Sequence, residues 1–285
     1  MIIQEVRCKR ALNPCKIKGF DYTFNPYIGC LHGCVYCYAR FMCFYREGKE
    51  KWGEFVDVKV NIPEALEEQV KHLKPGVVMI SSVTDAYHAI EKKYQITRRC
   101  LEILAENDFQ IALLTKSPLI TRDIDIIKKF DNSTHQPGFT IICLDEKDAR
   151  NFEPKAPSVK SRLKALEKMS ESGISTSVFI GPFIPGISDK NLEELFKHFK
   201  EAGVKTILLD KLNLKCGNWP EVKKVLDKHY PELATDYRKK WLTNEYYEGI
   251  RSKVITLCNK YDFSLNLIFR HPTQTKLKKI MDVKL

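Results

Sequence analysis

Short apolar runs alternate with longer amphipathic stretches along most of this 285-residue chain. The apolar runs predict strands at residues 22–28, 77–82, 109–114, 139–144, 176–184 and 206–212. The amphipathic stretches between them predict helices at residues 97–106, 121–130, 158–172 and 189–202. Apolar strands that alternate with helices form a parallel sheet covered on both faces. The pattern therefore predicts the α/β class, as a partial (β/α)6 barrel resembling part of a TIM barrel.

Helix-end residues support two of these helices. Ser158 stands where an N-cap is expected, and Gly173 follows the end of the same stretch. The helix at 189–202 opens with acidic residues and is followed by Gly203. We therefore expect both helices to begin and end close to these positions.

The last part of the chain has a different pattern and a different charge. Residues 219–228 and 237–260 predict helices, and residues 264–269 predict a final strand. We expect the barrel to occupy residues 1–212 and a mostly helical extension, packed on the barrel, to occupy residues 213–285. The net charge is +11, and residues 205–285 hold 17 basic against 9 acidic residues, a net of +8. This excess makes nucleic acid a candidate partner, although a lysine-rich solvated surface would give the same composition.

Three cysteines, Cys30, Cys34 and Cys37, lie close together with the spacing C-x3-C-x2-C. A structural zinc ion takes four protein ligands, and a 4Fe–4S cluster usually takes four cysteines, one for each iron. Three cysteines would leave one iron open to a small molecule. Zinc with Cys43 or His32 as fourth ligand is the alternative, although zinc motifs normally pair a C-x2-C with a distant second pair. The loop follows the first predicted strand, at the barrel end where ligands bind.

The spacing, with Tyr36 directly before the third cysteine, resembles the signature of the radical S-adenosylmethionine (SAM) enzymes. The resemblance implies two cofactors, a 4Fe–4S cluster and SAM, whose amino and carboxylate groups would bind the open iron. It also implies reductive cleavage of SAM to methionine and a 5′-deoxyadenosyl radical that abstracts hydrogen from a substrate. A reductant such as ferredoxin or flavodoxin would supply the electron.

Polar residues that follow the predicted strands are candidates to bind SAM. Thr84 and Asp85 follow the second strand and suit its ammonium group, while Lys116 follows the third and suits its carboxylate. Thr140, on the fourth strand, is a candidate for the ribose hydroxyls. Two further candidates are Ile184, in the run Gly181-Pro-Phe-Ile-Pro-Gly186 that suits the flat adenine, and Arg162, for carboxylate or ribose. Each of these residue types is also common as a cap, surface or core residue.

From about residue 21 to residue 189 the chain is similar to the spore photoproduct lyase-like subgroup, also called DNA repair photolyase-like. The motifs that carry this similarity are Asn-Pro-Tyr-Ile-Gly-Cys at 25–30, Thr-Asp-Ala-Tyr-His-Ala-Ile-Glu at 84–91, Thr-Lys-Ser at 115–117 and Glu-Pro-Lys-Ala-Pro at 153–157. The subgroup implies that Thr84 and Asp85 bind the amino group of SAM, Lys116 its carboxylate and Thr140 its ribose.

One position departs from that subgroup. Spore photoproduct lyase itself, which reverses a thymine-dimer lesion in DNA, has a cysteine hydrogen donor where this chain has Val83. Tyr38 remains a candidate to relay a hydrogen atom, and His88 and Glu91 are candidates to position a substrate or move a proton. We therefore expect a lyase-like radical SAM enzyme whose substrate is either nucleic acid or a peptide or small metabolite. A non-catalytic, metal-stabilised nucleic-acid-binding protein is the alternative from another class.

The cellular setting follows from cysteine usage and hydropathy. The chain has ten cysteines and begins Met-Ile-Ile-Gln-Glu, without the basic and apolar regions of a secretory signal. Such usage predicts metal binding in a reducing cytoplasm rather than a disulfide framework. No apolar run approaches the ~20 residues that a membrane-spanning helix needs, so we expect no membrane association.

Overall fold

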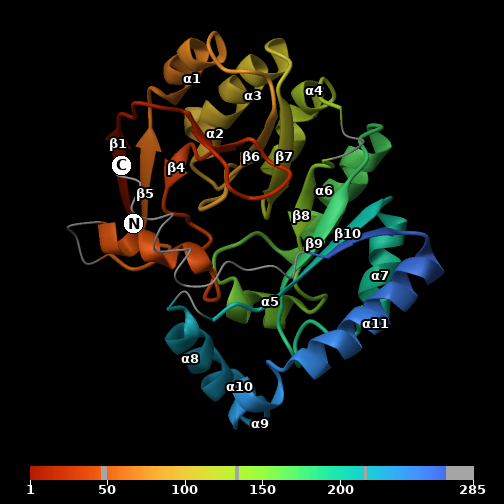
Figure 1. The fold of residues 1–285 in the computed structure, drawn as a ribbon. Coiled ribbons are helices and arrows are strands. Elements are labelled where there is room, and N and C mark those ends of the chain that lie inside the picture. The colour runs from red at the N-terminus through yellow and green to blue at the C-terminus, as the bar shows by residue number, and fades with distance from the viewer. Residues whose placement is uncertain (46–49, 132–134, 215–216, 268–285) are drawn as a thin grey trace.

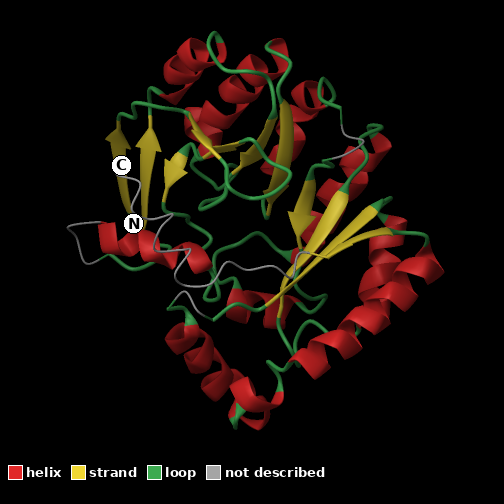
Figure 2. Ribbon diagram, viewed as in Figure 1, coloured by secondary structure: helices red, strands yellow, loops and turns green. Residues whose placement is uncertain are grey.

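The computed structural model describes residues 1–45, 50–131, 135–214 and 217–267, and its largest element is a curved eight-stranded sheet (Figures 1 and 2). The strand order is β11-β10-β9-β8-β7-β6-β3-β2, and all neighbours are parallel except β2 and β3. The strands are β2 (Leu12–Pro14), β3 (Tyr22–Phe24), β6 (Val77–Ile80), β7 (Gln110–Thr115), β8 (Gly138–Thr140), β9 (Ser177–Phe183), β10 (Thr206–Lys211) and β11 (Ser264–Leu267). The partial barrel is confirmed, since β3 and β6 to β10 lie side by side in chain order.

The first predicted strand is split between two sheets. Residues 22–28 were expected to be continuous, but β3 ends at Phe24 and β4 (Tyr27–Ile28) pairs instead with β5 (Phe55–Lys59). Pro26 has no amide hydrogen and restricts the residue before it, so the chain turns at this point. β5 also pairs with β1 (Ile2–Val6), which completes a separate three-stranded sheet. The chain therefore leaves the barrel just before the cysteines.

Helices cover the outer face of the barrel, as the alternating pattern predicts (Figure 2). The helices in the described ranges are η1 (Tyr38–Tyr45), α1 (Ile62–Val70), α2 (Glu91–Tyr94), α3 (Ile96–Glu106), η2 (Pro118–Asp123), α4 (Ile124–Ile127), α5 (Glu146–Phe152), α6 (Val159–Glu171), α7 (Leu192–Glu201), α8 (Trp219–His229), α9 (Pro231–Ala234), α10 (Tyr237–Lys240) and α11 (Asn244–Tyr261). The Ser158 hydroxyl caps α6 by accepting from the amide of Ser161 at 3.2 Å. Gly173 and Gly203 have φ angles of 84° and 75°, the left-handed conformation that ends a helix.

Two predicted helices differ from what the pattern indicated. Residues 121–130 form only the end of η2 and the short α4, and residues 237–260 are divided into α10 and α11. The division lies at Thr243, whose hydroxyl accepts from the amide of Tyr246 and so begins α11 as an N-cap. Cap chemistry here overrides a helical pattern that continues on both sides.

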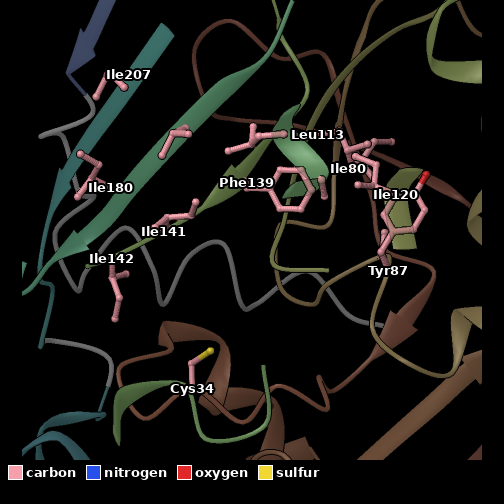
Figure 3. Close-up of a cluster of buried hydrophobic side chains, with 14 of the residues drawn as sticks. Cys34, Ile80, Tyr87, Leu113, Ile120, Phe139, Ile141, Ile142, Ile180 and Ile207 are labelled. Carbon is pink, nitrogen blue, oxygen red and sulfur yellow. The ribbon is translucent and has the colours of Figure 1, made fainter. Parts of the chain in front are cut away.

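One face of the barrel sheet is fully buried, and each of the strands β6 to β10 contributes an apolar residue to it (Figure 3). Ile80, Leu113, Phe139, Ile180 and Ile207 are each at most 2% exposed. Burying a side chain of this size contributes roughly 1.5–3 kcal/mol. This continuous apolar layer makes the barrel a rigid support for the loops at its strand ends.

The C-terminal segment joins the barrel sheet. β11 pairs with β10 in parallel, α11 contacts α7, and α8 contacts α5 (Figure 1). The predicted strand at 264–269 is thus present through residue 267, while residues 268 and 269 lie outside the described part. A domain boundary at residue 212 stays a prediction. No helix in the described ranges is long and apolar enough to cross a membrane.

Candidate active site

The three motif cysteines lie in the loop between β4 and η1. Cys30 and Cys34 are buried, Cys37 is partly buried, and none of the three forms a disulfide. Burial raises the pKa of Cys30, and Asp85, Cys34 and Cys37 raise it further by their charge. Burial likewise raises the pKa of Cys34 to about 12. The thiols therefore lie within electrostatic reach of one another, and a bound cationic centre would favour the thiolates that this site otherwise disfavours.

This donor set fits an iron–sulfur cluster better than a zinc ion. In the described ranges, no three His, Cys, Asp or Glu side chains are arranged to hold one metal ion. Zinc requires four ligands that converge on a single point, whereas a four-iron cluster takes each thiolate on a different iron. His32, expected as a zinc ligand in the alternative, places Nε2 at 3.0 Å from Asp85 Oδ2. The three thiols thus suit the cluster that the spacing predicts.

Two glycines shape the cysteine loop. Gly33 and Gly53 both have positive φ angles, and a Cβ on Gly53 would lie 2.7 Å from the Cα of Gly33. Lys155 stabilises this contact between the two glycines, since its Nζ donates a hydrogen bond to the carbonyl of Gly53 at 2.8 Å. Only glycine allows both this backbone conformation and this approach, so the loop has little freedom to change shape.

Asp85 organises the loop behind the cysteines. Oδ1 accepts from the hydroxyl of Thr115 at 2.6 Å and the amide of Tyr87 at 2.9 Å, while Oδ2 accepts from the amide of Lys116 at 2.9 Å and faces His32. Burial alone would raise the pKa of Asp85, but His32 and these hydrogen bonds outweigh it and hold the pKa well below its usual range. Four contacts fill the acceptor sites of a carboxylate. The expected contact of Asp85 with the ammonium group of SAM stays a prediction.

Glu153 is the centre of a second buried network. Its carboxylate accepts from the hydroxyl of Tyr36, lies 2.6 Å from Arg162 Nη2 and 3.8 Å from Lys116 Nζ. Arg162 Nη1 also donates to the carbonyl of Thr140 at 3.0 Å, at the end of β8. Arg162 is 1% exposed and holds Glu153 and the end of β8 in place. Its expected contact with the carboxylate or ribose of SAM stays a prediction.

Lys116 has a charge that this network leaves partly unbalanced. Arg162 and Glu153 form a close pair, so the ammonium of Lys116, over the Tyr36 ring at 5.6 Å, can meet a further anion. Burial lowers the pKa of Lys116, but Cys34 and Glu153 more than compensate and the pKa is raised. The side chain thus stays cationic near Cys34, which suits the expected contact with a carboxylate.

The other expected SAM contacts lie at strand ends around the same loop. The Thr84 hydroxyl donates to the carbonyl of Gly29 at 2.5 Å. Thr140 is buried at the end of β8, and Ile184 follows β9 with its amide bonded to Ser188 Oγ at 2.8 Å. Their contacts with SAM stay predictions.

Tyr38 lies at the surface beside Val83, the position at which a cysteine was expected from the comparison with spore photoproduct lyase. Its ring is 49% exposed, and its hydroxyl donates to the carbonyl of Ser82, the residue before Val83. Val83 itself packs against the group formed by Cys30, Ala39 and Trp52. An accessible phenol therefore stands next to the site of the missing thiol.

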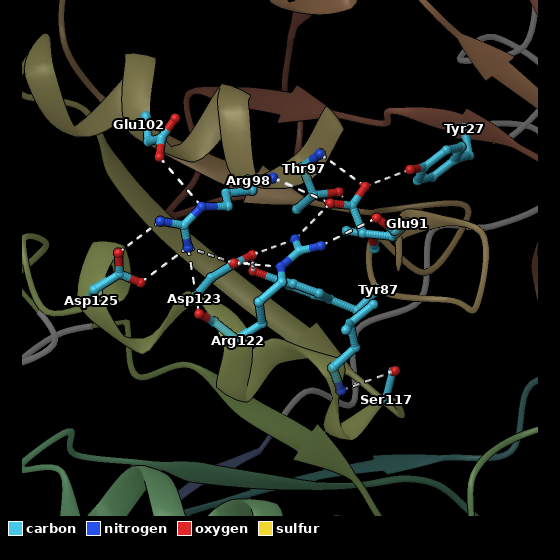
Figure 4. Close-up of polar contacts among 12 residues, drawn as sticks. Tyr27, Tyr87, Glu91, Thr97, Arg98, Glu102, Ser117, Arg122, Asp123 and Asp125 are labelled. Atoms are coloured by element: carbon cyan, nitrogen blue, oxygen red, sulfur yellow. Dashed lines mark hydrogen bonds and ion pairs between the residues drawn. The ribbon is translucent and has the colours of Figure 1, made fainter. Parts of the chain in front are cut away.

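Glu91 lies within a buried ion-pair network that joins α2, α3 and η2 (Figure 4). Its carboxylate accepts from the hydroxyl of Tyr27 and the amide of Thr97, and pairs with Arg122 Nη2 at 2.8 Å. Arg122 in turn pairs with Asp123 at 2.7 Å. Glu91 is 0% exposed and is held within this network, and its expected role toward a substrate stays a prediction.

His88 is equally buried, but it has no such network. Its ring is 0% exposed and lies 4.4 Å from the Tyr27 ring, and neither nitrogen has a hydrogen-bond partner among the described residues. Burial, followed by the charge of His32, lowers the pKa of His88 to about 3. The ring is therefore neutral and closed to solvent, which does not support the expected role in proton transfer.

One residue that closes the site was not anticipated from the sequence. Asn218, at the start of α8, donates from Nδ2 to the carbonyl of Tyr36 at 2.6 Å and to that of Asn213 at 2.9 Å. It is fully buried and lies 182 positions from Tyr36. An isolated asparagine has no sequence signal for such a contact, whereas the motif at 153–157 does mark Glu153.

A cleft of about 300 Å³ opens between the loops after β8 and β9 and the helices of the C-terminal segment. It is lined by Cys143, Asp145, Lys147, Asp148, Asn151, Ile187, Lys190, Asn191, His229 and Tyr230. Tyr230 donates to Asp148, and Lys190 lies 3.2 Å from the same carboxylate. The cleft is thus polar and lies at the strand ends, where ligands of such barrels bind.

Comparison with known sequences identifies the family. The radical SAM superfamily matches residues 24–199. An uncharacterized protein of Methanocaldococcus jannaschii is 37% identical over 270 residues, which cover 94% of this chain and 98% of that protein. A radical SAM Nα-GlyT isomerase of Pseudomonas phage M6 is 23% identical over 252 residues, which cover 86% of this chain and 50% of that protein.

Solved structures show the same fold. A spore photoproduct lyase variant with bound AdoMet and dinucleoside spore photoproduct has a TM-score of 0.71 at 16% identity, covering 94% of this chain and 82% of that one. SuiB of Streptococcus suis bound to its precursor peptide SuiA has a TM-score of 0.57 at 15% identity, covering 91% and 50%. With the three-cysteine loop, these matches show that the chain belongs to the radical SAM superfamily of enzymes, which use a 4Fe–4S cluster and S-adenosylmethionine.

Proposed function

We propose that the enzyme holds a 4Fe–4S cluster through Cys30, Cys34 and Cys37, binds SAM beside it, and abstracts hydrogen from a nucleic-acid substrate. When bound, the two cofactors supply reductive cleavage of SAM to methionine and a 5′-deoxyadenosyl radical, while the protein supplies binding and orientation. The observation that carries this proposal is the group of three motif thiols, two of them buried and one partly buried, beside the cationic Lys116. Family membership sets aside the alternative of a non-catalytic binding protein.

Different residues around the cysteines bind different parts of SAM. Lys116 pairs with its carboxylate, and Thr84 accepts from its ammonium group. Thr140 contacts the ribose, and Ile184 packs on the adenine. Tyr36 supports Lys116 from below, since its ring lies under the ammonium and its hydroxyl is held by Glu153.

Tyr38 takes the place of the thiol that is absent at Val83. A phenol can donate a hydrogen atom to a substrate radical and be restored by reduction, and the Tyr38 ring is exposed beside this position. The electron for each cycle comes from a reductant such as ferredoxin or flavodoxin.

Basic residues on α10 favour a nucleic-acid substrate. Arg238, Lys239 and Lys240 are consecutive and exposed, and none has an ion-pair partner in the part of the chain that the structure describes. Arg238 lies over the Trp219 ring at 5.7 Å. By contrast, Lys223 on α8 is paired with Asp227 of the same helix. Unpaired cations beside an aromatic ring are the features with which proteins hold nucleic-acid strands.

Four aromatic residues that could stack on nucleic-acid bases differ in their exposure. Tyr27 and Tyr36 are buried and have hydroxyls engaged with carboxylates, so they offer no free face. Trp219 and Trp241 are partly buried on the C-terminal helices. Of these four residues, Trp219 and Trp241 are therefore the ones that could stack on bases.

The first experiment measures 5′-deoxyadenosine. The cluster is reconstituted without oxygen, reduced with dithionite and supplied with SAM, with and without duplex or single-stranded DNA or RNA. We expect product that a Cys34→Ala variant does not form, and stimulation by nucleic acid. A fully loaded cluster that yields no product would refute the SAM chemistry.

The second experiment tests the substrate class. An Arg238→Ala, Lys239→Ala, Lys240→Ala variant should bind DNA or RNA more weakly, with a slope of log K against log salt lower by up to about 3. The control Lys223→Ala should change little, because that ammonium is already paired. If 5′-deoxyadenosine forms at the same rate with and without nucleic acid, and the protein binds no DNA or RNA at low salt, the substrate would instead be a peptide or a small metabolite. SuiB, which shares this fold, was solved with its precursor peptide bound.

A further inference from the structure

Trp52 is a buried residue that packs against the cysteine loop. It lies between η1 and β5 and is 6% exposed. It forms a buried apolar group with Cys30 and Ala39, and the partly buried Cys37, Met42, Cys43 and Val83 pack against that group. Its neighbour Gly53 is in backbone contact with Gly33, which fixes the indole against this loop.

The indole nitrogen of Trp52 has no acceptor. Nε1 is inaccessible to solvent and makes no hydrogen bond with any residue in the described ranges. An indole N–H can only donate, and buried donors in proteins are nearly always satisfied. An orphaned donor in this position therefore needs an explanation.

The surroundings of the donor suggest which acceptor is missing. Four members of this apolar group carry a sulfur atom, namely Cys30, Cys37, Cys43 and Met42. A neutral thiol or thioether is a weak acceptor, but a thiolate or sulfide carries negative charge and accepts strongly. The site therefore gains an acceptor for Trp52 when its cysteines bind the cluster.

We propose that Trp52 donates a hydrogen bond from Nε1 to a sulfur of the bound cluster, and that this bond raises the reduction potential of the cluster. Hydrogen bonds to cluster sulfurs are among the features that set such potentials. The reduced cluster carries one more negative charge than the oxidised cluster, so a donor stabilises it more. Trp52 is thus a positioning and tuning residue. The inference rests on the proposed cluster site but needs neither SAM nor a substrate.

The test is a redox titration of the reconstituted protein without SAM, followed by the EPR signal of the reduced cluster. Trp52→Phe keeps an aromatic ring and removes the N–H, so we expect a lower potential. For a one-electron couple, each fall of about 59 mV means a tenfold smaller ratio of reduced to oxidised cluster at a fixed potential. The control is Trp241→Phe, because Trp241 packs on Tyr246 at the C-terminal helices and should leave the potential unchanged. An unchanged potential in a fully loaded Trp52→Phe protein would overturn the proposal.

A second measurement needs no variant and covers the case in which Trp52→Phe does not fold. Pulsed EPR of the reduced wild-type protein, grown with tryptophan labelled with 15N in the ring, should show a 15N coupling and an exchangeable proton near the cluster. Absence of both would overturn the proposal.

The two proposals can fail separately. A cluster that shows the Trp52 effects without forming 5′-deoxyadenosine would refute the proposed function alone. A protein that assembles no cluster would refute both.

Discussion

Glu153 balances the buried charge beneath the cysteines, so its removal should be costly. It is 1% exposed and contacts Arg162 at 2.6 Å, the Tyr36 hydroxyl, and Lys116 at 3.8 Å. Glu153→Gln keeps the size and one oxygen but removes the charge, which leaves the buried Arg162 and the partly buried Lys116 without this carboxylate. Breaking a buried pair by removing one partner costs about 3–5 kcal/mol. Because Arg162 keeps its bond to the Thr140 carbonyl, we expect the lower end, a loss of about 3 kcal/mol in the free energy of unfolding.

The assay is urea unfolding of the cluster-free protein under reducing conditions, followed by tryptophan fluorescence. A double-mutant cycle with Arg162→Met should be non-additive, because the double variant leaves only Lys116 unbalanced. The matched control is Glu64→Gln, which removes the partner of Arg99 at 3.1 Å on the surface and should cost less than about 1 kcal/mol.

The same pair predicts how stability depends on pH. Burial raises the pKa of Glu153, but Arg162 and Lys116 outweigh burial and the pKa is lowered. A lowered pKa means that the unfolded chain takes up the proton first, so the stabilisation is complete above the unfolded pKa and is lost as the pH falls. Glu153→Gln should remove this acid sensitivity. If the free energy of unfolding of Glu153→Gln lies within about 1 kcal/mol of the wild-type value, the charge-balance argument is wrong.

Three further substitutions test other parts of the site. The pKa of His88 is about 3 in the folded protein, so the wild type should lose about 2 kcal/mol of unfolding free energy between pH 7.5 and pH 5, as the unfolded histidine is protonated below pH 6.5. His88→Phe should remove this loss. An equal change in the free energy of urea unfolding between the two pH values in wild type and variant would contradict this. Asn218→Ala should lower stability by about 1–3 kcal/mol in urea unfolding, because it leaves buried carbonyls unpaired, and a loss near zero would show that the contact with Tyr36 is unimportant. Gly53→Ala should lower the iron bound after reconstitution, because its Cβ would meet Gly33 at 2.7 Å. The control is Gly19→Ala, because Gly19 has a similar φ angle and a Cβ added there would meet no atom within 4 Å. An equal loss of iron in both variants would exclude the contact between Gly53 and Gly33 as the cause.

The barrel could be predicted from local patterns because its strands are buried on both sides. β6, β7, β9 and β10 are each a short apolar run, and such runs can be recognised one at a time. The three-stranded sheet could not be predicted, because β4 is two residues long and its partners β1 and β5 come from distant parts of the chain. A pairing between such segments leaves no periodic pattern in either of them.

The cysteine spacing and the strand-end positions of Thr84, Lys116 and Thr140 were visible in the sequence itself, because each depends on neighbours within a few residues. The tertiary structure decided which polar groups are free. It engaged Asp85, Glu91 and Arg162 in buried networks. It also brought Asn218 to the cysteine loop and left the Trp52 donor without an acceptor. The physical reason is that burial and hydrogen-bond partnership depend on contacts between residues far apart in the chain, which a one-dimensional pattern does not contain.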